Sequence, residues 1–384
     1  MISKTQTSHL DSIGTFLAME IYTKAHQLSE QGRDIIHMEF GEPDFSAPID
    51  AVESVQKSME KNSAGYTLSQ GLEGLRNEIT QKYEDDYGVK IIPEQVLVTN
   101  GSSLLLYMAI RLIAPPNSQV IMTDPCYACY ENVVRLAGAE PVMVKLRRED
   151  GFQLDVDDLK KMVTSKTRAI LINSPMNPTG VVFSSEIMQS LADLGIPVIS
   201  DEIYADLSFE DSPYSFLSFS ANTIAINGFS KSFAMTGWRL GYMITPPEWM
   251  YAADRIHQNL MISATEFIQE AGISVLQKSK VYCEKMKAEL NQRRIFVLKK
   301  MQELGMDPGY TPSGAFYVFY KYPDSTKSSR SLCHEILEKT GVAIAPGRDF
   351  GPMGEGYIRL SYAQSMENLE RALTKLSECK LLTC

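Results

Sequence analysis

Six short apolar segments, rich in valine and isoleucine, recur through the middle of the chain. They span residues 95–99, 119–123, 141–144, 168–172, 196–200 and 223–226. Because these segments do not alternate between apolar and polar residues, they are typical of strands buried on both faces of a sheet. Helical segments, such as residues 104–113 and 187–194, lie between some of them. This order predicts an α/β fold with a mostly parallel sheet flanked by helices.

A different pattern begins after about residue 278. Residues 281–304 form a long, charged, amphipathic segment that predicts a helix, and residues 315–319 and 342–345 predict strands. Ser365 is positioned to cap a further helix. The apolar face of that helix would carry Leu369, Ala372, Leu373 and Leu376. This part of the chain therefore predicts a smaller α+β domain.

The length of 384 residues favours two domains, because such a chain is too long for one small domain. We expect a large domain of residues 46–278 and a small domain formed by residues 1–45 and 279–384. No proline-rich or glycine-rich linker marks the boundary in the sequence.

The composition argues against several classes of protein. The chain is 44% hydrophobic and 22% charged, as expected for a soluble globular protein, and its net charge of -10 argues against binding to nucleic acid. The most apolar run, residues 104–116, is interrupted by Arg111 and is shorter than the roughly 20 residues that a membrane span needs. The N-terminus lacks the apolar core of a secretion signal, so we expect no membrane partner.

The cysteines and histidines do not predict a metal site. The six cysteines are dispersed, apart from Cys126 and Cys129, and this pattern fits reduced thiols in a cytoplasm. The five histidines are isolated from one another, so neither a bound metal nor a Ser/His/Asp triad is predicted.

The segment NGFSKSFAMTGWR, residues 227–239, carries the strongest chemical signal. Lys231 follows the apolar segment 223–226, and Arg239 follows eight residues later. A desolvated lysine amine can form a Schiff base with a carbonyl, and an arginine can hold a phosphate. Pyridoxal phosphate has both an aldehyde and a phosphate, so this cofactor would use both residues. A lysine followed by an arginine also occurs on ordinary helix surfaces, so other segments must support the assignment.

Two further segments are suited to such a cofactor, and each follows a predicted strand. Gly101, Ser102 and Ser103 open the helix of residues 104–113, where free N–H groups and the helix dipole suit a phosphate. Tyr127 follows the next strand and could stack on a flat ring. An ordinary helix cap and a core aromatic residue are the alternatives.

Polar side chains follow two later strands. Asn177 lies in a turn with two prolines and a glycine, from which its amide could donate to a phenolate oxygen. Asp201 could keep a ring nitrogen protonated, and Tyr204, three residues later, could reach the ring oxygen. A plain turn and a helix-capping aspartate are the alternatives.

Arg359 lies in an apolar segment near the C-terminus, where an unpaired cation would be costly. Its fork of N–H groups matches a carboxylate, such as that of a substrate, and a structural salt bridge is the alternative. Near the N-terminus, the tight turn at Gly41 could bring backbone close to a ligand.

In their order and spacing, these segments resemble the class I/II aminotransferases, which are pyridoxal phosphate enzymes of fold type I. The resemblance extends from GEPDF at residues 41–45 to IRLS at residues 358–361, so it covers essentially the whole chain. It implies a large cofactor-binding domain with a mostly parallel sheet and a smaller α+β domain. It also implies an active homodimer, because Tyr66 is similar to a family tyrosine that reaches the phosphate in the neighbouring subunit.

The resemblance also implies roles for the matching residues. Lys231 would be the Schiff-base lysine and the acid/base catalyst, and Asp201 would pair with the ring nitrogen. Tyr204 and Asn177 would bond the phenolic oxygen, while Tyr127 would stack on the ring. The phosphate would be held by Gly101, Ser102, Ser103, Ser230, Arg239 and the neighbouring chain's Tyr66. The substrate α-carboxylate would be bound by Arg359, Asn177 and the backbone near Gly41.

The chain departs from the family pattern at two positions. Gly228 stands three residues before Lys231, where many members have a serine, so one phosphate bond is either missing or supplied by Ser230. Ser102 stands where some aspartate-selective relatives have a lysine, which weakens the case for specificity toward acidic side chains.

The expected activity is transfer of an amino group between an L-amino acid and a 2-oxo acid by a ping-pong mechanism. A β-eliminating lyase is the alternative, because the same residues serve both reactions. A non-catalytic pyridoxal phosphate sensor is less favoured, since such proteins carry a DNA-binding extension and little of this chain precedes the GEPDF segment. The amino donor stays open, although Phe40 and residues 13–21 are expected by analogy to line the side-chain pocket.

Overall fold

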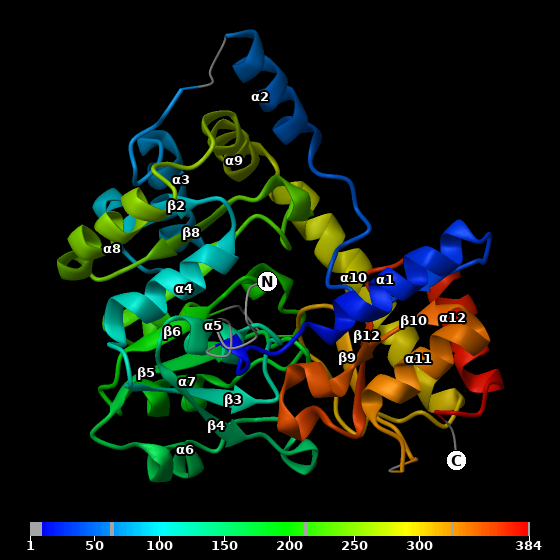
Figure 1. The fold of residues 1–384 in the computed structure, drawn as a ribbon. Helices are drawn as coiled ribbons and strands as arrows, with labels where there is room; N and C mark the ends of the chain where they lie inside the picture. Colours follow the sequence, from blue (N-terminus) through cyan, green and yellow to red (C-terminus); the bar gives the residue numbers. More distant parts are fainter. Residues whose placement is uncertain (1–9, 62–64, 211–213, 325, 383–384) are drawn as a thin grey trace, which may run out of the picture.

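The computed structural model describes residues 10–61, 65–210, 214–324 and 326–382. Figure 1 shows a large sheet with its helices and, beside it, a smaller group of helices and strands drawn from both ends of the chain. The helices are α1 (Leu17–Glu30), α2 (Ile49–Glu60), α3 (Glu73–Tyr87), α4 (Ser102–Ile113), α5 (Tyr130–Leu136), α6 (Val156–Met162), α7 (Ser185–Ala192), α8 (Pro247–Leu260), α9 (Glu266–Lys278), α10 (Lys280–Glu303), α11 (Ser329–Thr340) and α12 (Met366–Glu378). The strands are β1 (Ile36–His37), β2 (Val96–Thr99), β3 (Gln119–Asp124), β4 (Glu140–Lys145), β5 (Thr167–Asn173), β6 (Val198–Asp201), β7 (Thr223–Gly228), β8 (Gly241–Ile244), β9 (Tyr317–Lys321), β10 (Val342–Ala343), β11 (Ala345–Pro346) and β12 (Tyr357–Ser361). Within these described ranges, every helix is too short or too polar to cross a membrane.

The large sheet contains seven strands in the order β2-β8-β7-β6-β5-β3-β4. β8 pairs antiparallel with both of its neighbours, and the other neighbouring strands are parallel. The mostly parallel sheet predicted from the six apolar segments is therefore confirmed. β8 is missing from the predicted strands because its sequence, GYMI, contains a glycine and lacks the run of valine and isoleucine that marks the others.

The two faces of this sheet are covered by different helices. Along β3, Val120 and Met122 belong to an apolar cluster with residues of α4, α5 and α8. Ile121, which lies between them in sequence, packs into a second cluster with residues of α6 and α7. Successive side chains of a strand point to opposite faces, so a strand covered on both faces must be apolar along its whole length. This is why the strands are continuous apolar runs in the sequence.

The smaller region contains elements from both ends of the chain. β1 pairs in parallel with β10, and β11, β12 and β9 form a separate antiparallel sheet. The two expected helices are confirmed as α10 and α12, and the Ser365 hydroxyl caps α12 by accepting a hydrogen bond from Asn368 N at 3.2 Å. The single strand expected at residues 342–345 is wrong, because the chain passes from one sheet to the other within this segment. The domain limits at residues 46 and 278 stay a prediction.

The carboxyl ends of the strands form one edge of the large sheet. β2, β3, β5, β6 and β7 run in the same direction, so the residues that follow these strands meet at that edge. Asn173 and Asp201 end neighbouring strands and lie opposite each other in the register of β5 and β6. In open α/β sheets a ligand binds at this edge, so the topology predicts where a functional site lies.

Candidate functional site

A cavity of about 380 Å³ is formed by residues that follow the strand ends together with residues of the smaller region. Most residues selected from the sequence line it: Gly41, Ser102, Ser103, Tyr127, Asn177, Asp201, Tyr204, Ser230, Lys231, Arg239 and Arg359. Phe40 lines it as well, with Phe16 from the segment expected at the side-chain pocket. The lining also includes residues without a distinctive sequence signal: Glu42, Leu106, Tyr130, Asn173, Ile203, Thr236 and Tyr317.

Lys231 lies in the turn that follows β7, and its side chain is partly buried. Its Nζ donates a hydrogen bond to the backbone oxygen of Gly41 at 2.7 Å. Burial lowers the pKa of Lys231 to about 8, although the Glu42 carboxylate opposes the shift. The positive charges of Arg359 and Arg239 act in the same direction as burial. At neutral pH a larger fraction of Lys231 is therefore in the neutral form, which attacks carbonyls and accepts protons, than in an ordinary lysine.

Asp201 ends β6, and two donors hold its carboxylate. The Tyr130 hydroxyl donates to Oδ2 at 2.6 Å, and the backbone N–H of Ile203 donates to Oδ1 at 3.2 Å. Burial raises the pKa of Asp201 to about 6, while both hydrogen bonds favour the ionised form and limit the rise. Near pH 7 the cavity therefore contains a buried carboxylate. Tyr130 gives no sequence signal, because a buried aromatic residue on a helix is typical of a core.

The turn after β5 is built around two asparagines. Asn173 Nδ2 donates to the backbone oxygen of Asp201 at 2.9 Å, and Asn173 Oδ1 accepts from the Asn177 N–H at 2.8 Å. Asn173 therefore fixes the turn against the neighbouring strand and sets the position of Asn177. The sequence selects Asn177 for its rigid turn, and the structure adds Asn173 as the residue that anchors it.

Arg359 is buried in β12 and has one donor without a partner. Its Nη1 donates to Asn177 Oδ1 at 2.9 Å, and its Nη2 donates to the backbone oxygen of Glu39. The guanidinium carbon lies 4.4 Å from the ring centre of Tyr317 and 4.7 Å from that of Phe350. Among the described residues, Arg359 Nε has no hydrogen-bond partner. Arg359 lines the cavity, and a buried guanidinium there is suited to bind an anion.

Tyr204 and Tyr317 form a hydrogen-bonded pair in the wall of the cavity. Their hydroxyl oxygens are 2.8 Å apart, and either hydroxyl can be the donor. Tyr317 also restricts the residue near it, because a Cβ atom at Gly41 would overlap the Tyr317 hydroxyl. Only glycine allows the backbone at this position to approach both Tyr317 and Lys231.

The start of α4 and the Arg239 guanidinium form a cationic corner of the cavity. Gly101 precedes α4 with a φ of 92°, which favours glycine, and a Cβ atom there would overlap the Arg239 guanidinium. Gly101 does not line the cavity itself, but its lack of a side chain allows Arg239 to approach the start of α4. Ser102, Ser103 and Ser230 line the same cavity. Helix N–H groups, hydroxyls and a guanidinium together are suited to bind a phosphate.

Gly228, where the family pattern often has a serine, has no room for a side chain. It lies opposite Gly241 in the register of β7 and β8, and a Cβ atom at Gly228 would lie 2.9 Å from the backbone oxygen of Leu240. A serine at this position would therefore require β8 to move. The close approach of these two strands therefore explains why a glycine occupies this position.

Tyr66 lies outside this cavity within its own chain. It is 82% exposed and belongs to a loop that is anchored by a hydrogen bond from Thr67 N to Ser263 Oγ at 3.3 Å. Leu68 in the same loop is 68% exposed, and Ile262, next to Ser263, is 50% exposed. The loop thus presents apolar side chains to the surface.

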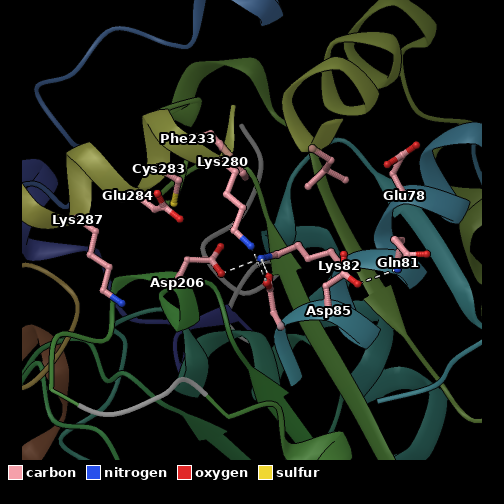
Figure 2. Close-up of a pocket in the computed structure, with 12 residues that line it drawn as sticks. Glu78, Gln81, Lys82, Asp85, Asp206, Phe233, Lys280, Cys283, Glu284 and Lys287 are labelled. Carbon is pink, nitrogen blue, oxygen red and sulfur yellow. Dashed lines mark hydrogen bonds and ion pairs between the residues drawn. The ribbon is translucent and has the colours of Figure 1, made fainter. Parts of the chain in front are cut away.

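A second cavity, of about 390 Å³, shares a segment with the first (Figure 2). Asp206, two residues after Tyr204, lines this second cavity together with Lys82 of α3. Lys82 Nζ donates to Asp206 Oδ1 at 2.8 Å and to Asp86 Oδ2 at 2.6 Å. Figure 2 shows the Lys82 side chain extending toward Asp206. Helix α3 therefore holds the segment that carries Asp201 and Tyr204 through a largely buried ion pair.

Known proteins share the sequence and the fold of this chain. The sequence signature of the family described as aminotransferase class I and II matches residues 33–376. The (5-formylfuran-3-yl)methyl phosphate transaminase of Methanocaldococcus jannaschii is 39% identical over 369 residues, which cover 95% of this chain and 96% of that relative. The aspartate aminotransferase of Pyrococcus horikoshii is 34% identical over 367 residues, which cover 94% of this chain and 93% of that relative. The solved structure of aspartate aminotransferase from Thermus thermophilus with maleate is similar with a TM-score of 0.93 and 31% identity, covering 98% of this chain and 100% of that chain.

Proposed function

Since the chain belongs to the class I and II aminotransferase family, whose members are pyridoxal phosphate enzymes, we propose that the cavity around Lys231 is its active site. The observation that supports this most directly is one cavity shared by a buried amine of lowered pKa, a carboxylate and two guanidinium groups. In this site an amino group moves between an L-amino acid and a 2-oxo acid. One cavity serves both substrates in turn, so the kinetics are ping-pong.

The cationic corner of the cavity fits the phosphate of pyridoxal phosphate. Arg239 supplies a permanent positive charge, and the start of α4 supplies free N–H groups and the positive end of a helix dipole. The hydroxyls of Ser102, Ser103 and Ser230 add further donors. A side chain at Gly228 would require β8 to move, so Ser230, which lines the cavity, would supply the phosphate bond that a serine three residues before the lysine makes in the family pattern.

The remaining lining fits the ring of the cofactor. The Asp201 carboxylate would hold a proton at the ring nitrogen, and the Tyr127 ring would cover one face. The Tyr204 hydroxyl and the Asn177 amide would donate to the phenolic oxygen. When bound, pyridoxal phosphate supplies an aldehyde that reacts with amines and a ring that withdraws electrons from the substrate Cα.

Lys231 is the group that moves the proton. With the cofactor bound, its Nζ would accept the proton from the substrate Cα and hold it for return to the reacting molecule. Burial favours the neutral amine that this step requires. Asp201 would favour a protonated ring nitrogen, because its carboxylate is ionised near pH 7 and held by Tyr130.

Arg359 orients the substrate by its α-carboxylate. Its guanidinium lines the cavity and would donate to the carboxylate oxygens. The hydrogen bond to Asn177 and the rings of Tyr317 and Phe350 fix the plane of the guanidinium. The backbone at Gly41 lies close to Lys231 and would border the same substrate group.

Transamination is favoured over β-elimination, because the similar proteins are described as a transaminase and as aminotransferases. Their names differ in substrate, so they do not identify the amino donor of this chain. The same relationship makes the chain an enzyme rather than a sensor without catalysis. A cytoplasmic location, favoured by the dispersed cysteines, is part of the proposal.

The half-reaction tests the proposed function. We expect the visible absorbance of the cofactor to change when the holoenzyme receives one amino acid without an acceptor, with release of one equivalent of 2-oxo acid. Double-reciprocal plots of the complete reaction should be parallel. Continuous release of pyruvate and ammonia without an acceptor would favour elimination, and failure to bind pyridoxal phosphate would refute the assignment of the site.

We also propose that the enzyme is a homodimer in which Tyr66 reaches the phosphate site of the partner subunit. Tyr66 is 82% exposed and does not line the cavity of its own chain. Leu68 and Ile262 expose apolar surface on the same loops, and a second copy of the chain would cover it.

Mixed dimers test this arrangement. Each proposed site takes Lys231 from one subunit and Tyr66 from the other. A mixed dimer of Lys231→Ala and Tyr66→Phe therefore contains one intact site and one site with both substitutions. Mixing the two variants under conditions that exchange subunits should raise activity above that of either variant alone. The control mixes Lys231→Ala with the double variant Lys231→Ala/Tyr66→Phe and should gain nothing. A monomer by light scattering, or an unimpaired Tyr66→Phe variant, would contradict the proposal.

A further inference from the structure

We propose that Asp349 is a positioning residue that seats the N-terminus of α1, and that Phe16 thereby forms one wall of a subsite for an apolar or aromatic substrate side chain. This inference deepens the proposed function and rests on it. It specifies a substrate class and assigns a role to a residue far from Phe16 in the sequence.

The wall of the proposed subsite is aromatic. Phe16 and Phe40 line the cavity that contains Lys231 and Arg359, and neither is needed to hold the cofactor. Phe40 packs edge-on against Tyr22 of α1, with ring centres 4.7 Å apart. The part of the wall formed by Phe16, which precedes α1, and Phe40, which packs against α1, is therefore apolar and suits a substrate side chain of the same character.

The charges in the cavity disfavour an acidic substrate side chain. The cations that line it among the described residues are Lys231, Arg239 and Arg359, and each has a role in binding the cofactor or the α-carboxylate. Glu42, which also lines the cavity, is close enough to raise the pKa of Lys231. A second carboxylate on the substrate would meet Glu42 and would have no free cation from this chain to pair with.

Asp349 supplies the cap that α1 lacks. Phe16 occupies the N-cap position of α1 and has no capping side chain of its own. The Asp349 carboxylate instead accepts hydrogen bonds from Leu17 N at 2.8 Å and Ala18 N at 2.9 Å. These N–H groups belong to the first turn, where an anion also complements the helix dipole. The carboxylate thus fixes the backbone immediately next to Phe16.

The turn that contains Asp349 also contacts the carboxylate-binding residue. Asp349 and Phe350 are adjacent in a short 3₁₀ turn, Gly347–Phe350, and the Phe350 ring lies 4.7 Å from the Arg359 guanidinium carbon. One turn therefore supports both ends of the substrate: Phe350 stacks on Arg359 at the α-carboxylate, and Asp349 anchors the segment with Phe16 at the side chain.

The test compares amino donors in the half-reaction of the holoenzyme. We expect phenylalanine and leucine to react with a higher kcat/KM than aspartate and glutamate. Phe16→Ala should raise the KM for phenylalanine by about 10- to 100-fold, with a smaller effect on alanine, which has no large side chain to place. Asp349→Ala should reproduce this selective rise in KM while kcat changes less. Asp349→Asn should restore part of the loss, because its amide oxygen can accept one of the two hydrogen bonds.

Asp155→Ala is the matched control. Asp155 is the N-cap residue of α6 and accepts hydrogen bonds from Asp157 N and Asp158 N through its side chain, but it does not line the cavity. Asp155→Ala should remove two capping hydrogen bonds, as Asp349→Ala does, and should leave the KM for phenylalanine at its wild-type value. Thermal unfolding of every variant separates loss of fold from loss of positioning, and Asp349→Asn supplies the test if Asp349→Ala does not fold.

Three results would overturn parts of the inference. Faster reaction of aspartate or glutamate than of phenylalanine would refute the substrate class. An unchanged KM for phenylalanine in folded Asp349→Ala or Asp349→Asn would refute the positioning role, and so would an equal rise in KM in Asp155→Ala. By contrast, an enzyme that binds pyridoxal phosphate but reacts with no amino acid would contradict the proposed function itself.

Discussion

Replacement of Lys231 by alanine is expected to lower turnover by a factor of about 10⁴ or more, because it removes both the covalent attachment of the cofactor and the acid/base group. The protein should still fold. The ammonium form of Lys231 is disfavoured by burial, and its hydrogen bond to the Gly41 carbonyl contributes little net stability. Activity and thermal unfolding, measured on the same preparation, check both expectations.

Borohydride reduction provides a second measurement that does not depend on turnover. In the wild type, reduction should attach the cofactor irreversibly to the peptide that contains Lys231, as mass spectrometry would show. The Lys231→Ala variant should carry no such label. Lys299→Ala is the control, because Lys299 is an exposed lysine on α10 and should retain both label and activity. Label on another lysine, or turnover within tenfold of wild type, would show that the assignment of Lys231 is wrong.

Replacement of Lys82 by methionine is expected to lower the free energy of unfolding by about 3–5 kcal/mol. Lys82 and Asp206 are each only 14% exposed, so the variant leaves a largely buried carboxylate without its cation. Methionine keeps most of the apolar stem, and the loss therefore reports on the charge rather than on packing. Since unfolding free energies are commonly about 5–15 kcal/mol, this change is a large part of the total.

The dependence of this loss on pH follows from the two pKa shifts. Burial would raise the pKa of Asp206, but the nearby Lys82 ammonium outweighs burial and lowers the pKa below its ordinary value of 3.8. Burial would likewise lower the pKa of Lys82, but Asp206 and other acidic groups raise it well above 10.5. The stabilisation is therefore lost as the pH falls through the lowered pKa of Asp206, or rises through the raised pKa of Lys82. The difference between wild type and Lys82→Met should be largest at about pH 7 to 9. It should shrink as the pH falls, because burial raises the pKa of the unpaired Asp206 in the variant and protonation removes its charge.

Urea unfolding at several pH values measures this effect. The double variant Lys82→Met/Asp206→Asn should recover much of the stability, because it removes the unpaired charge as well. Lys57→Met is the matched control, since Lys57 forms an exposed helical ion pair with Glu53 and its loss should cost under about 1 kcal/mol. Equal losses for Lys82→Met and Lys57→Met would mean that the buried pair does not stabilise the segment that follows Tyr204.

The sequence predicts those strands of the large sheet that are covered on both faces, because such strands must be apolar along their whole length. It does not predict β8, whose assignment depends on pairing with β2 and β7 rather than on its own four residues. The prediction of a single strand at residues 342–345 is wrong for a similar reason. A short apolar run does not reveal that its two halves pair in different sheets.

Within the site, the sequence identifies side chains whose chemistry is unusual for their surroundings. Lys231 follows an apolar strand and Arg359 lies inside one. Both are conspicuous in the sequence, because burying a cation without a partner costs free energy. Tyr130 and Tyr317 are not conspicuous, because buried tyrosines are common in cores and only their hydroxyl contacts give them a role here. No sequence pattern identifies Asp349 either, since it caps a helix that begins 332 residues earlier at Leu17. The residue limits of the two domains stay a prediction.

The position of β2 in the sheet has a consequence for the timing of folding during synthesis. Among the described residues, β2 pairs in the sheet with β8 alone, and β8 ends at Ile244, which is 145 residues after the end of β2 at Thr99. At a synthesis rate of about 5–20 residues per second, a nascent β2 waits about 7–30 s for its neighbour. The strands β3 to β7 pair with one another and can assemble during this interval. The cationic corner at the start of α4, which we propose binds the cofactor phosphate, follows directly from β2. A newborn chain is therefore expected to retain its cofactor only after the middle of the sheet has formed.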